Sequence, residues 1–325
     1  MSATDNAIKT MRTVRYHEYG EPADVVKLEE ATVPTPGAGQ IRIAVHACAL
    51  NPADWALCRG MFPGALPRGI GFDVSGVVDA IGDDVTGVSV GDKVLGVPDW
   101  AGCPSAGLAD YAVLTHWAPV PDGLDLIEAA SLPMVVETTV RSLDNLEVAA
   151  GHTLMVHGAG TMVGFAAVQV ARMRGTRVIA TAGKTFAERL RALGAIVTPY
   201  GDGMVERVRD LAGGSPDLIL DTSPPSGGVL PDLVKIADGD PKRVLTVTDH
   251  EAAKELGVRN TFGEDATIRY DALAPFAELA AAGKFVVPVA RTFPMKDWRE
   301  AMDVSLSGHA HGKLVIQVAR NLAED

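Results

Sequence analysis

Apolar and polar residues alternate along the first third of the chain in the way that β-strands require. The pattern repeats every second residue in Gln40–His46, and apolar runs follow at Val74–Val78 and Val88–Val97, interrupted by glycine–aspartate pairs. Such alternation indicates strands with one buried face, and the glycine–aspartate pairs indicate turns. The sequence from Thr13 to about Val120 therefore predicts an all-β lobe, in which residues 51–67 form a loop suited to carry a site.

Beyond Asp122 the period becomes helical, and two helices are predicted at Leu126–Ala130 and Val135–Leu146. Apolar runs then alternate with helical patterns, which predicts a doubly wound parallel sheet. The predicted strands lie near 153–157, 177–182, 195–199, 216–221, 243–248 and 285–290, and the helices between them near 162–174, 185–193, 204–212, 227–237 and 272–282.

After Pro294 a helix at Lys296–Ser305 and a strand at Leu314–Val318 are assigned back to the β lobe. The predicted domains are therefore a β lobe, residues 1–125 plus 292–325, and an α/β nucleotide-binding domain, residues 126–291.

The stretch Thr153–Lys184 carries the clearest functional motif. An apolar run leads into Gly158-Ala159-Gly160, a helical pattern follows, and a second apolar run ends the unit. This order of strand, glycine turn, helix and strand is typical of dinucleotide binding, because glycines let the backbone approach a pyrophosphate at a helix N-terminus. The third glycine is Gly164, with Val163 where the G-x-G-x-x-G pattern has a glycine, and a purely structural turn is the alternative interpretation.

The end of the second strand favours NADPH over NADH. It reads Thr181-Ala182-Gly183-Lys184, with no carboxylate until Glu188. An NAD site usually places Asp or Glu about 20 residues past the glycines to bind the ribose 2′-hydroxyl. Small residues and a lysine would instead accommodate a 2′-phosphate, although Lys184 could also be a solvated loop residue.

Composition limits the partners. The chain has 325 residues, enough for two domains, and a formal net charge of −12, which disfavours nucleic acid and anionic membranes. No uncharged stretch reaches the ~20 apolar residues of a membrane span, and the first residues lack a signal peptide pattern, so we expect a soluble cytoplasmic protein. The cysteines (Cys48, Cys58 and Cys103) are too few for a disulfide framework and fit a reducing compartment.

Several motifs together resemble the medium-chain dehydrogenase/reductase superfamily, and within it the quinone oxidoreductase group. The resemblance covers nearly the whole length and implies a GroES-like β lobe, a Rossmann domain and a homodimer. The motifs are Asn51-Pro52-Ala53-Asp54, Gly71-Phe72-Asp73 with Val74–Val78, Gly91-Asp92-Lys93-Val94, Leu132-Pro133 with Thr138, Val156–Gly160 and Gly312-Lys313-Leu314-Val315.

The residues do not match the zinc-dependent relatives. Those relatives carry a cysteine where this chain has Asn51, and Gly-His-Glu where it has Gly71-Phe72-Asp73. Phenylalanine cannot bind zinc, and the four-cysteine loop of a structural zinc site is missing. We expect no metal site. Without a metal to polarise an alcohol or ketone, acceptors whose conjugation spreads negative charge, such as quinones and α,β-unsaturated carbonyl compounds, are the natural substrates.

Residue by residue, the resemblance implies that Asn51 and Thr138 border the nicotinamide and that Tyr200 approaches the 2′-phosphate. Thr161 stands where relatives have glycine and Met162 where they have a small residue, so the pyrophosphate turn is either wider or uses the Thr161 hydroxyl. Arg189 is a second candidate for the 2′-phosphate, because relatives place their lysine further along than Lys184. The predicted cofactor-binding set is Gly158, Gly160, Thr161, Met162, Val163, Gly164, Gly183, Lys184, Tyr200 and Thr248.

No proton donor is evident. Zinc-free relatives often use a tyrosine, but the matching positions here hold Ala56 and Phe62. Asp54 is a candidate catalytic acid or a helix cap. Glu137 is a candidate substrate contact, or an acid whose pKa is raised by burial, or a carboxylate near a helix start. Trp55, Phe62 and Trp100 are candidate walls of a pocket for a flat acceptor, or ordinary core residues.

The sequence thus predicts a zinc-independent, NADPH-dependent reductase of quinones or activated double bonds, whose protons can come from solvent. One alternative is a reductase of a specific biosynthetic, polyketide-like intermediate. Another is a non-catalytic NADPH-binding sensor, which NADPH consumption with any acceptor would exclude.

Overall fold

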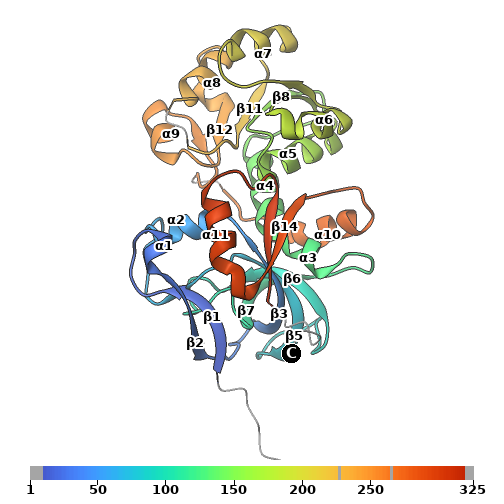
Figure 1. Ribbon diagram of the computed structural model, residues 1–325. Helices are drawn as coiled ribbons and strands as arrows, with labels where there is room; N and C mark the ends of the chain where they lie inside the picture. Colours follow the sequence, from blue (N-terminus) through green and yellow to red (C-terminus); the bar gives the residue numbers. More distant parts are fainter. Residues whose placement is uncertain (1–9, 226–227, 264–265, 319–325) are drawn as a thin grey trace, which may run out of the picture. The chain divides into compact units, whose positions relative to one another are not determined.

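The computed structural model describes residues 10–225, 228–263 and 266–318, which form two compact units (Figure 1). The first unit comprises the chain up to Met134, Leu273–Lys284 and the chain from Pro288 onward. The second comprises Val135–Ala272 and Phe285–Val287.

The first unit is built around a sheet with the strand order β14-β15-β3-β5-β6-β7, in which β3 also pairs with β7. That pairing closes β3, β5, β6 and β7 into a barrel. The strands are β3 (Ile41–Leu50), β5 (Asp73–Ile81), β6 (Lys93–Pro98), β7 (Tyr111–Pro119), β14 (Val289–Pro294) and β15 (Lys313–Gln317). A smaller sheet has the order β2-β1-β4, from β1 (Thr10–Tyr16), β2 (Val26–Thr32) and β4 (Arg68–Gly69).

Strand β3 shows why the sequence pattern specifies this unit. Ile41, Ile43 and Val45 are buried, and the residues between them are half-buried, as the period of two predicts. From Ala47 to Leu50 every residue is buried, because α3 (Leu126–Ala130) packs on β3 and β5. The other helices of this unit are α1 (Pro22–Val25), α2 (Pro52–Cys58), α10 (Leu273–Ala281) and α11 (Trp298–Leu306), with a 3₁₀ turn at Met295–Asp297.

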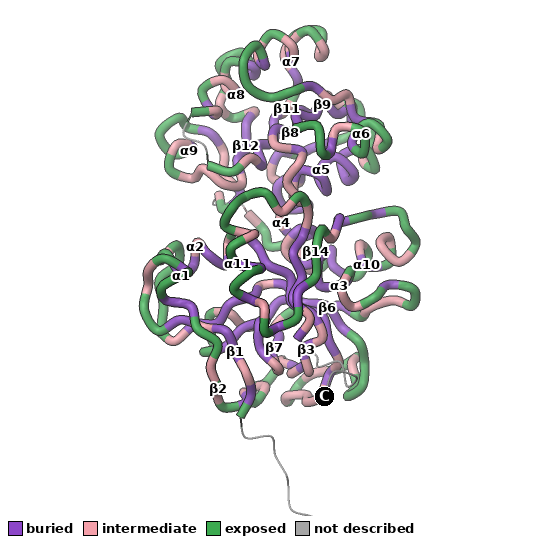
Figure 2. Tube along the Cα trace, in the orientation of Figure 1, coloured by how far each residue is buried: buried purple, intermediate pink, exposed green. Residues whose placement is uncertain are grey.

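The second unit is a doubly wound parallel sheet with the order β10-β9-β8-β11-β12-β13, the 3-2-1-4-5-6 order of dinucleotide-binding folds. Figure 2 shows its central strands as buried. The strands are β8 (Thr153–His157), β9 (Arg177–Thr181), β10 (Ile196–Thr198), β11 (Leu218–Asp221), β12 (Val244–Thr246) and β13 (Arg259–Asn260). The helices are α4 (Pro133–Asn145, which begins in the first unit), α5 (Met162–Met173), α6 (Lys184–Ala192), α7 (Met204–Ala212), α8 (Leu230–Ile236) and α9 (His250–Leu256), with 3₁₀ turns at Pro241–Arg243 and Tyr270–Ala272.

The prediction of a sixth sheet strand at 285–290 is wrong. Phe285 and Val287 are buried, which explains the apolar pattern. However, the backbone of Val286 bonds the side-chain amide of Gln169, at 2.9 and 3.0 Å, in place of a neighbouring strand. The sixth strand is β13, which is too short and too polar to leave an apolar run.

Three further details differ from the sequence prediction. The segment 51–67, expected to be a loop, begins with α2, whose start fits Pro52 at the first helical position. The predicted boundary at 125 differs from the observed one near Met134, because α3 buries Ala129 and Ala130 within the first unit. Helix α10 also belongs there, where it packs against β7.

Among the described helices, none has the length and apolar character needed to cross a bilayer.

Candidate functional site

The turn after β8 is shaped by glycines with different tasks. Gly158 has φ of +73°, and a Cβ on it would lie 2.6 Å from the backbone nitrogen of Ser223. A Cβ on Gly164 would lie 2.5 Å from Oγ1 of Thr222. Both glycines are therefore required by close packing. At Gly160 the nearest atom to a Cβ is Cδ2 of Phe186 at 3.6 Å, so this position leaves room for a ligand against the backbone.

Thr161, at a position where the family resemblance led us to expect glycine, is the N-cap of α5. Its Oγ1 accepts a hydrogen bond from the backbone nitrogen of Gly164 at 3.0 Å and donates to Oγ1 of Thr222 at 3.1 Å. The hydroxyl is thus engaged in capping the helix. The backbone N–H groups of Met162 and Val163 have no hydrogen-bond partner within the described ranges, as expected in the first turn of a helix. They form an anion-binding end of the kind that holds a pyrophosphate.

A buried polar layer fixes the carboxyl ends of the neighbouring strands. Oγ1 of Thr181 lies 2.8 Å from Nδ1 of His157, and Oγ1 of Thr222 donates to the carbonyl of His157 at 2.9 Å. Asp221 accepts from Oγ1 of Thr246 at 2.8 Å and from the hydroxyl of Ser223 at 2.8 Å. Burial lowers the pKa of His157, and the nearby Asp221 opposes that shift. Ligands bind at this edge in sheets of this strand order.

Three of the predicted cofactor residues lie together past the end of β9. Gly183 is the N-cap of α6, and a Cβ on it would lie 3.7 Å from the hydroxyl of Tyr200, whose side chain is 60% exposed. Lys184 is the first residue of α6 and is exposed. Thr248 lies elsewhere on the same edge, where its hydroxyl donates to the carbonyl of Ser223 at 2.6 Å. The strand end thus presents a small residue, a cation and a phenol to solvent.

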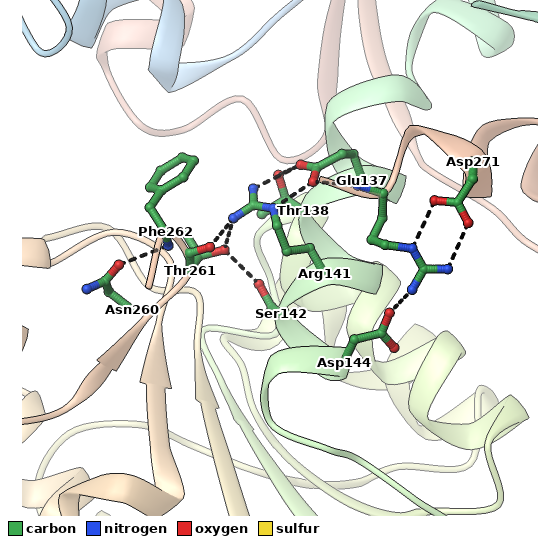
Figure 3. Close-up of polar contacts among 10 residues, drawn as sticks. Glu137, Thr138, Arg141, Ser142, Asp144, Asn260, Thr261, Phe262 and Asp271 are labelled. Atoms are coloured by element: carbon green, nitrogen blue, oxygen red, sulfur yellow. Dashed lines mark hydrogen bonds and ion pairs between the residues drawn. The ribbon is translucent and has the colours of Figure 1, made fainter. Parts of the chain in front are cut away.

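Glu137 is a partner in a buried ion pair (Figure 3). Its carboxylate accepts hydrogen bonds from Nε and Nη2 of Arg141 at 2.6 and 2.9 Å, and both side chains are less than a tenth exposed. It also accepts from the backbone nitrogen of Arg269 at 3.3 Å and the hydroxyl of Thr138 at 3.4 Å. These contacts favour a structural role for Glu137 over a substrate contact, and its i,i+4 spacing to Arg141 was the available sequence signal.

In the first unit, Asn51 and Asp54 belong to a buried polar network. Nζ of Lys313 donates to Oδ1 of Asn51 at 2.6 Å and to Oδ2 of Asp73 at 2.9 Å. The amide nitrogen of Asn51 donates to the same oxygen of Asp73 at 2.9 Å, and the other oxygen accepts from the backbone of Met134 at 2.7 Å. Lys313 and Asp73 are 4% and 0% exposed, so the amide of Asn51 is held in one orientation by a buried ion pair.

Asp54 has both oxygens engaged with backbone. They accept from the nitrogens of Asn51 and Gly71 at 2.7 and 2.8 Å, and the residue is 1% exposed. Burial raises the pKa of this carboxyl to about 7, although the two backbone hydrogen bonds lower it. The geometry favours the helix-cap interpretation of Asp54 over that of a catalytic acid.

A zinc ion does not fit the residues at Asn51, Phe72 and Asp73. The ammonium of Lys313 already occupies the oxygens of Asn51 and Asp73. Phe72 packs against Trp100, with ring centroids 5.4 Å apart. The described part of the chain contains no group of three or more His, Cys, Asp or Glu side chains suited to a metal ion.

The three candidate aromatic wall residues have different environments. Trp55 is 2% exposed, and its Nε1 donates to Oγ of Ser305 at 2.8 Å. This environment favours the interpretation of Trp55 as an ordinary core residue. Phe62 is 46% exposed. Trp100 is half-buried beside Phe72, with the Arg68 guanidinium 5.2 Å from its ring centroid. Sequence reasoning missed Arg68, which no motif signals.

Comparisons with known proteins agree with this architecture. The alcohol dehydrogenase GroES-like domain matches residues 37–122, and the zinc-binding dehydrogenase family matches residues 109–316. The chain is 30% identical over 327 residues to the chloroplastic quinone-oxidoreductase QR1 of Triphysaria versicolor, covering 95% of this chain and 99% of that protein. It is 35% identical over 188 residues to quinone oxidoreductase of Rattus norvegicus, covering 56% of each. The solved quinone oxidoreductase from Coxiella burnetii has a TM-score of 0.79 at 28% identity, covering 96% of this chain and all of that one.

Proposed function

Because the chain belongs to the medium-chain dehydrogenase/reductase superfamily, in its quinone oxidoreductase-like group, we propose that it is a zinc-independent NADPH-dependent reductase of quinones or α,β-unsaturated carbonyl compounds. Members of this group are oxidoreductases that use a nicotinamide cofactor. The observation that carries the proposal is the glycine turn at the N-terminus of α5, with Gly160 open to a ligand. When bound there, the cofactor supplies the hydride.

The residues past β9 support a preference for NADPH. The strand end offers Gly183, Lys184 and Tyr200 and no carboxylate to receive a ribose 2′-hydroxyl. A lysine beside a small residue can neutralise a 2′-phosphate.

We expect Lys184→Ala to weaken NADPH binding about tenfold and to leave NADH binding unchanged. Equal affinity of the native protein for the two cofactors would contradict this preference.

The first unit supports an acceptor that needs no metal. Phe72 stands where zinc-dependent relatives have a metal ligand, and it packs against Trp100. Such apolar rings can stack on a flat conjugated molecule. Asp54 is buried and accepts hydrogen bonds from two backbone nitrogens, so it is not an exposed acid for proton transfer. A quinone or enone suits this chemistry because its reduced form can take protons from solvent.

The reaction is tested by following the nicotinamide absorbance of NADPH while quinones, enals and enones are added to the metal-free protein. Oxidation by one acceptor class supports the proposal and identifies the substrate class. Tight binding without oxidation by any acceptor would contradict it, and would favour a dedicated biosynthetic substrate or a sensor. We also propose a homodimer in the cytoplasm, and light scattering with purified protein tests the dimer.

A further inference from the structure

Helix α6 carries Arg189, to which the proposed function assigns no role. The Arg189 guanidinium carbon lies 5.6 Å from the ring centroid of Phe165 and 5.9 Å from that of Phe186. The two rings pack on each other with centroids 5.7 Å apart. The side chain is exposed, and within the described ranges it has no ion-pair or hydrogen-bond partner. Arg189 is thus held by two aromatic faces with its N–H groups free for an anion.

The two rings connect Arg189 to the glycine turn, because one of them also contacts the turn. Cδ2 of Phe186 is the atom that faces the open position at Gly160, and Phe165 lies in the first turn of α5. A pyrophosphate approaching Gly160 would carry two negative charges next to the helix N-terminus, which supplies only about half a unit of positive charge. A fixed guanidinium supplies a full charge and a planar set of donors.

Helix geometry separates Arg189 from the 2′-phosphate residues. Lys184 is the first residue of α6, and Arg189 follows five residues later. Five residues advance the helix by about 7.5 Å and turn it by about 140°, so the two side chains leave different sides of the helix. Phe186 and Arg189 are three residues apart on the helix, so their side chains are neighbours, and Phe186 contacts the turn.

We propose that Arg189 binds the cofactor pyrophosphate, and that Lys184 and Tyr200 bind the 2′-phosphate of the adenosine ribose. This inference rests on the proposed cofactor site. It makes Arg189 a binding residue that contributes to both cofactors alike, whereas Lys184 distinguishes them.

The test measures binding of ADP-ribose and 2′-phospho-ADP-ribose by calorimetry, so that neither nicotinamide nor turnover is needed. We expect Arg189→Ala to weaken both ligands by the same factor, about tenfold. Arg189→Lys keeps the charge but loses the planar fork, and should recover only part of the affinity. Arg191→Ala is the matched control, because Arg191 lies on the same helix but is paired with Glu188 at 2.5 Å.

The outcomes separate the inference from the cofactor site itself. Loss confined to 2′-phospho-ADP-ribose would overturn the inference and assign Arg189 to the 2′-phosphate. Unchanged affinity for both ligands in Arg189→Ala would overturn it as well, while leaving the cofactor site intact. If the native protein binds neither ligand, the proposed cofactor site fails, and the inference fails with it.

Discussion

The glycines of the turn differ in what a side chain would meet, and this difference can be measured. A side chain on Gly160 meets only Phe186 at contact distance, whereas one on Gly164 collides with Thr222 and the carbonyl of Gly158. We expect Gly160→Val to keep the melting temperature of the native protein but to weaken NADPH binding at least tenfold, because the branched side chain occupies the pyrophosphate position. Gly164→Ala should instead lower the melting temperature, because overpacking costs about 1–3 kcal/mol in the free energy of unfolding.

Thermal unfolding and a fluorescence titration of NADPH on the two variants give the comparison. If Gly160→Val binds NADPH as tightly as the native protein, the phosphate does not lie at this turn.

Asp54 links the stability of the first unit to pH. Its pKa is about 7 in the folded chain, chiefly through burial, against about 4 for an unfolded aspartate. Between these values the folded state holds a proton that the unfolded state has lost, so the contribution of Asp54 to stability is fully present below about pH 4 and is lost as pH rises through about 7. We expect Asp54→Asn to remove this slope, while lowering stability at pH 4 because an amide accepts fewer hydrogen bonds.

Urea unfolding of both proteins at half-unit intervals from pH 4 to 8 isolates the contribution of Asp54 as the difference between the two curves. Parallel curves would mean that the carboxyl is already ionised in the folded protein at pH 4.

Arg141 joins helix α4 to Thr261, the residue after β13, and forms an ion pair with Glu137 of the same helix. Nη1 of Arg141 donates to the hydroxyl of Thr261 at 2.5 Å, and its guanidinium lies 4.7 Å from the ring centroid of Phe262. Removing one partner would leave the other charge buried and unpaired. We expect Glu137→Leu or Arg141→Met alone to cost about 3–5 kcal/mol in the free energy of unfolding, and the double variant to cost clearly less than the sum.

Denaturant unfolding of the two single variants and the double variant forms the cycle. Additive losses would show that the two side chains do not act as a pair.

Most helices and strands could be predicted because their apolar residues follow the period of the element. Strands β8, β9 and β15 and helices α5 and α11 begin and end within a few residues of the predicted bounds. The errors have physical causes. In the run at 285–290, Phe285 and Val287 are buried, yet a glutamine side chain and not a neighbouring strand bonds the backbone of Val286. Periodicity cannot separate these two cases.

The candidate site was predictable where the backbone decides it and not where side chains from distant segments meet. The glycine turn and the strand end at Gly183 follow from local spacing. The contact of Lys313 with Asn51 joins residues 262 positions apart, which no local pattern reveals. The stacking of Arg189 likewise depends on how α5 and α6 pack.

For the molecule as a whole, the proposal that the chain works without a metal depends on the buried ammonium of Lys313. It compensates Asp73 and fixes Asn51 in the core of the first unit, where zinc-dependent relatives hold metal ligands. We therefore expect exhaustive treatment with a chelator to leave the melting temperature, NADPH affinity and rate of NADPH oxidation unchanged, and added Zn²⁺ to raise none of them. Metal analysis of the purified protein, before and after the chelator, accompanies these measurements. A rate that is lost with the metal and restored by Zn²⁺ would mean that the ion displaces Lys313 from its oxygens, and the zinc-independent proposal would then have to be abandoned.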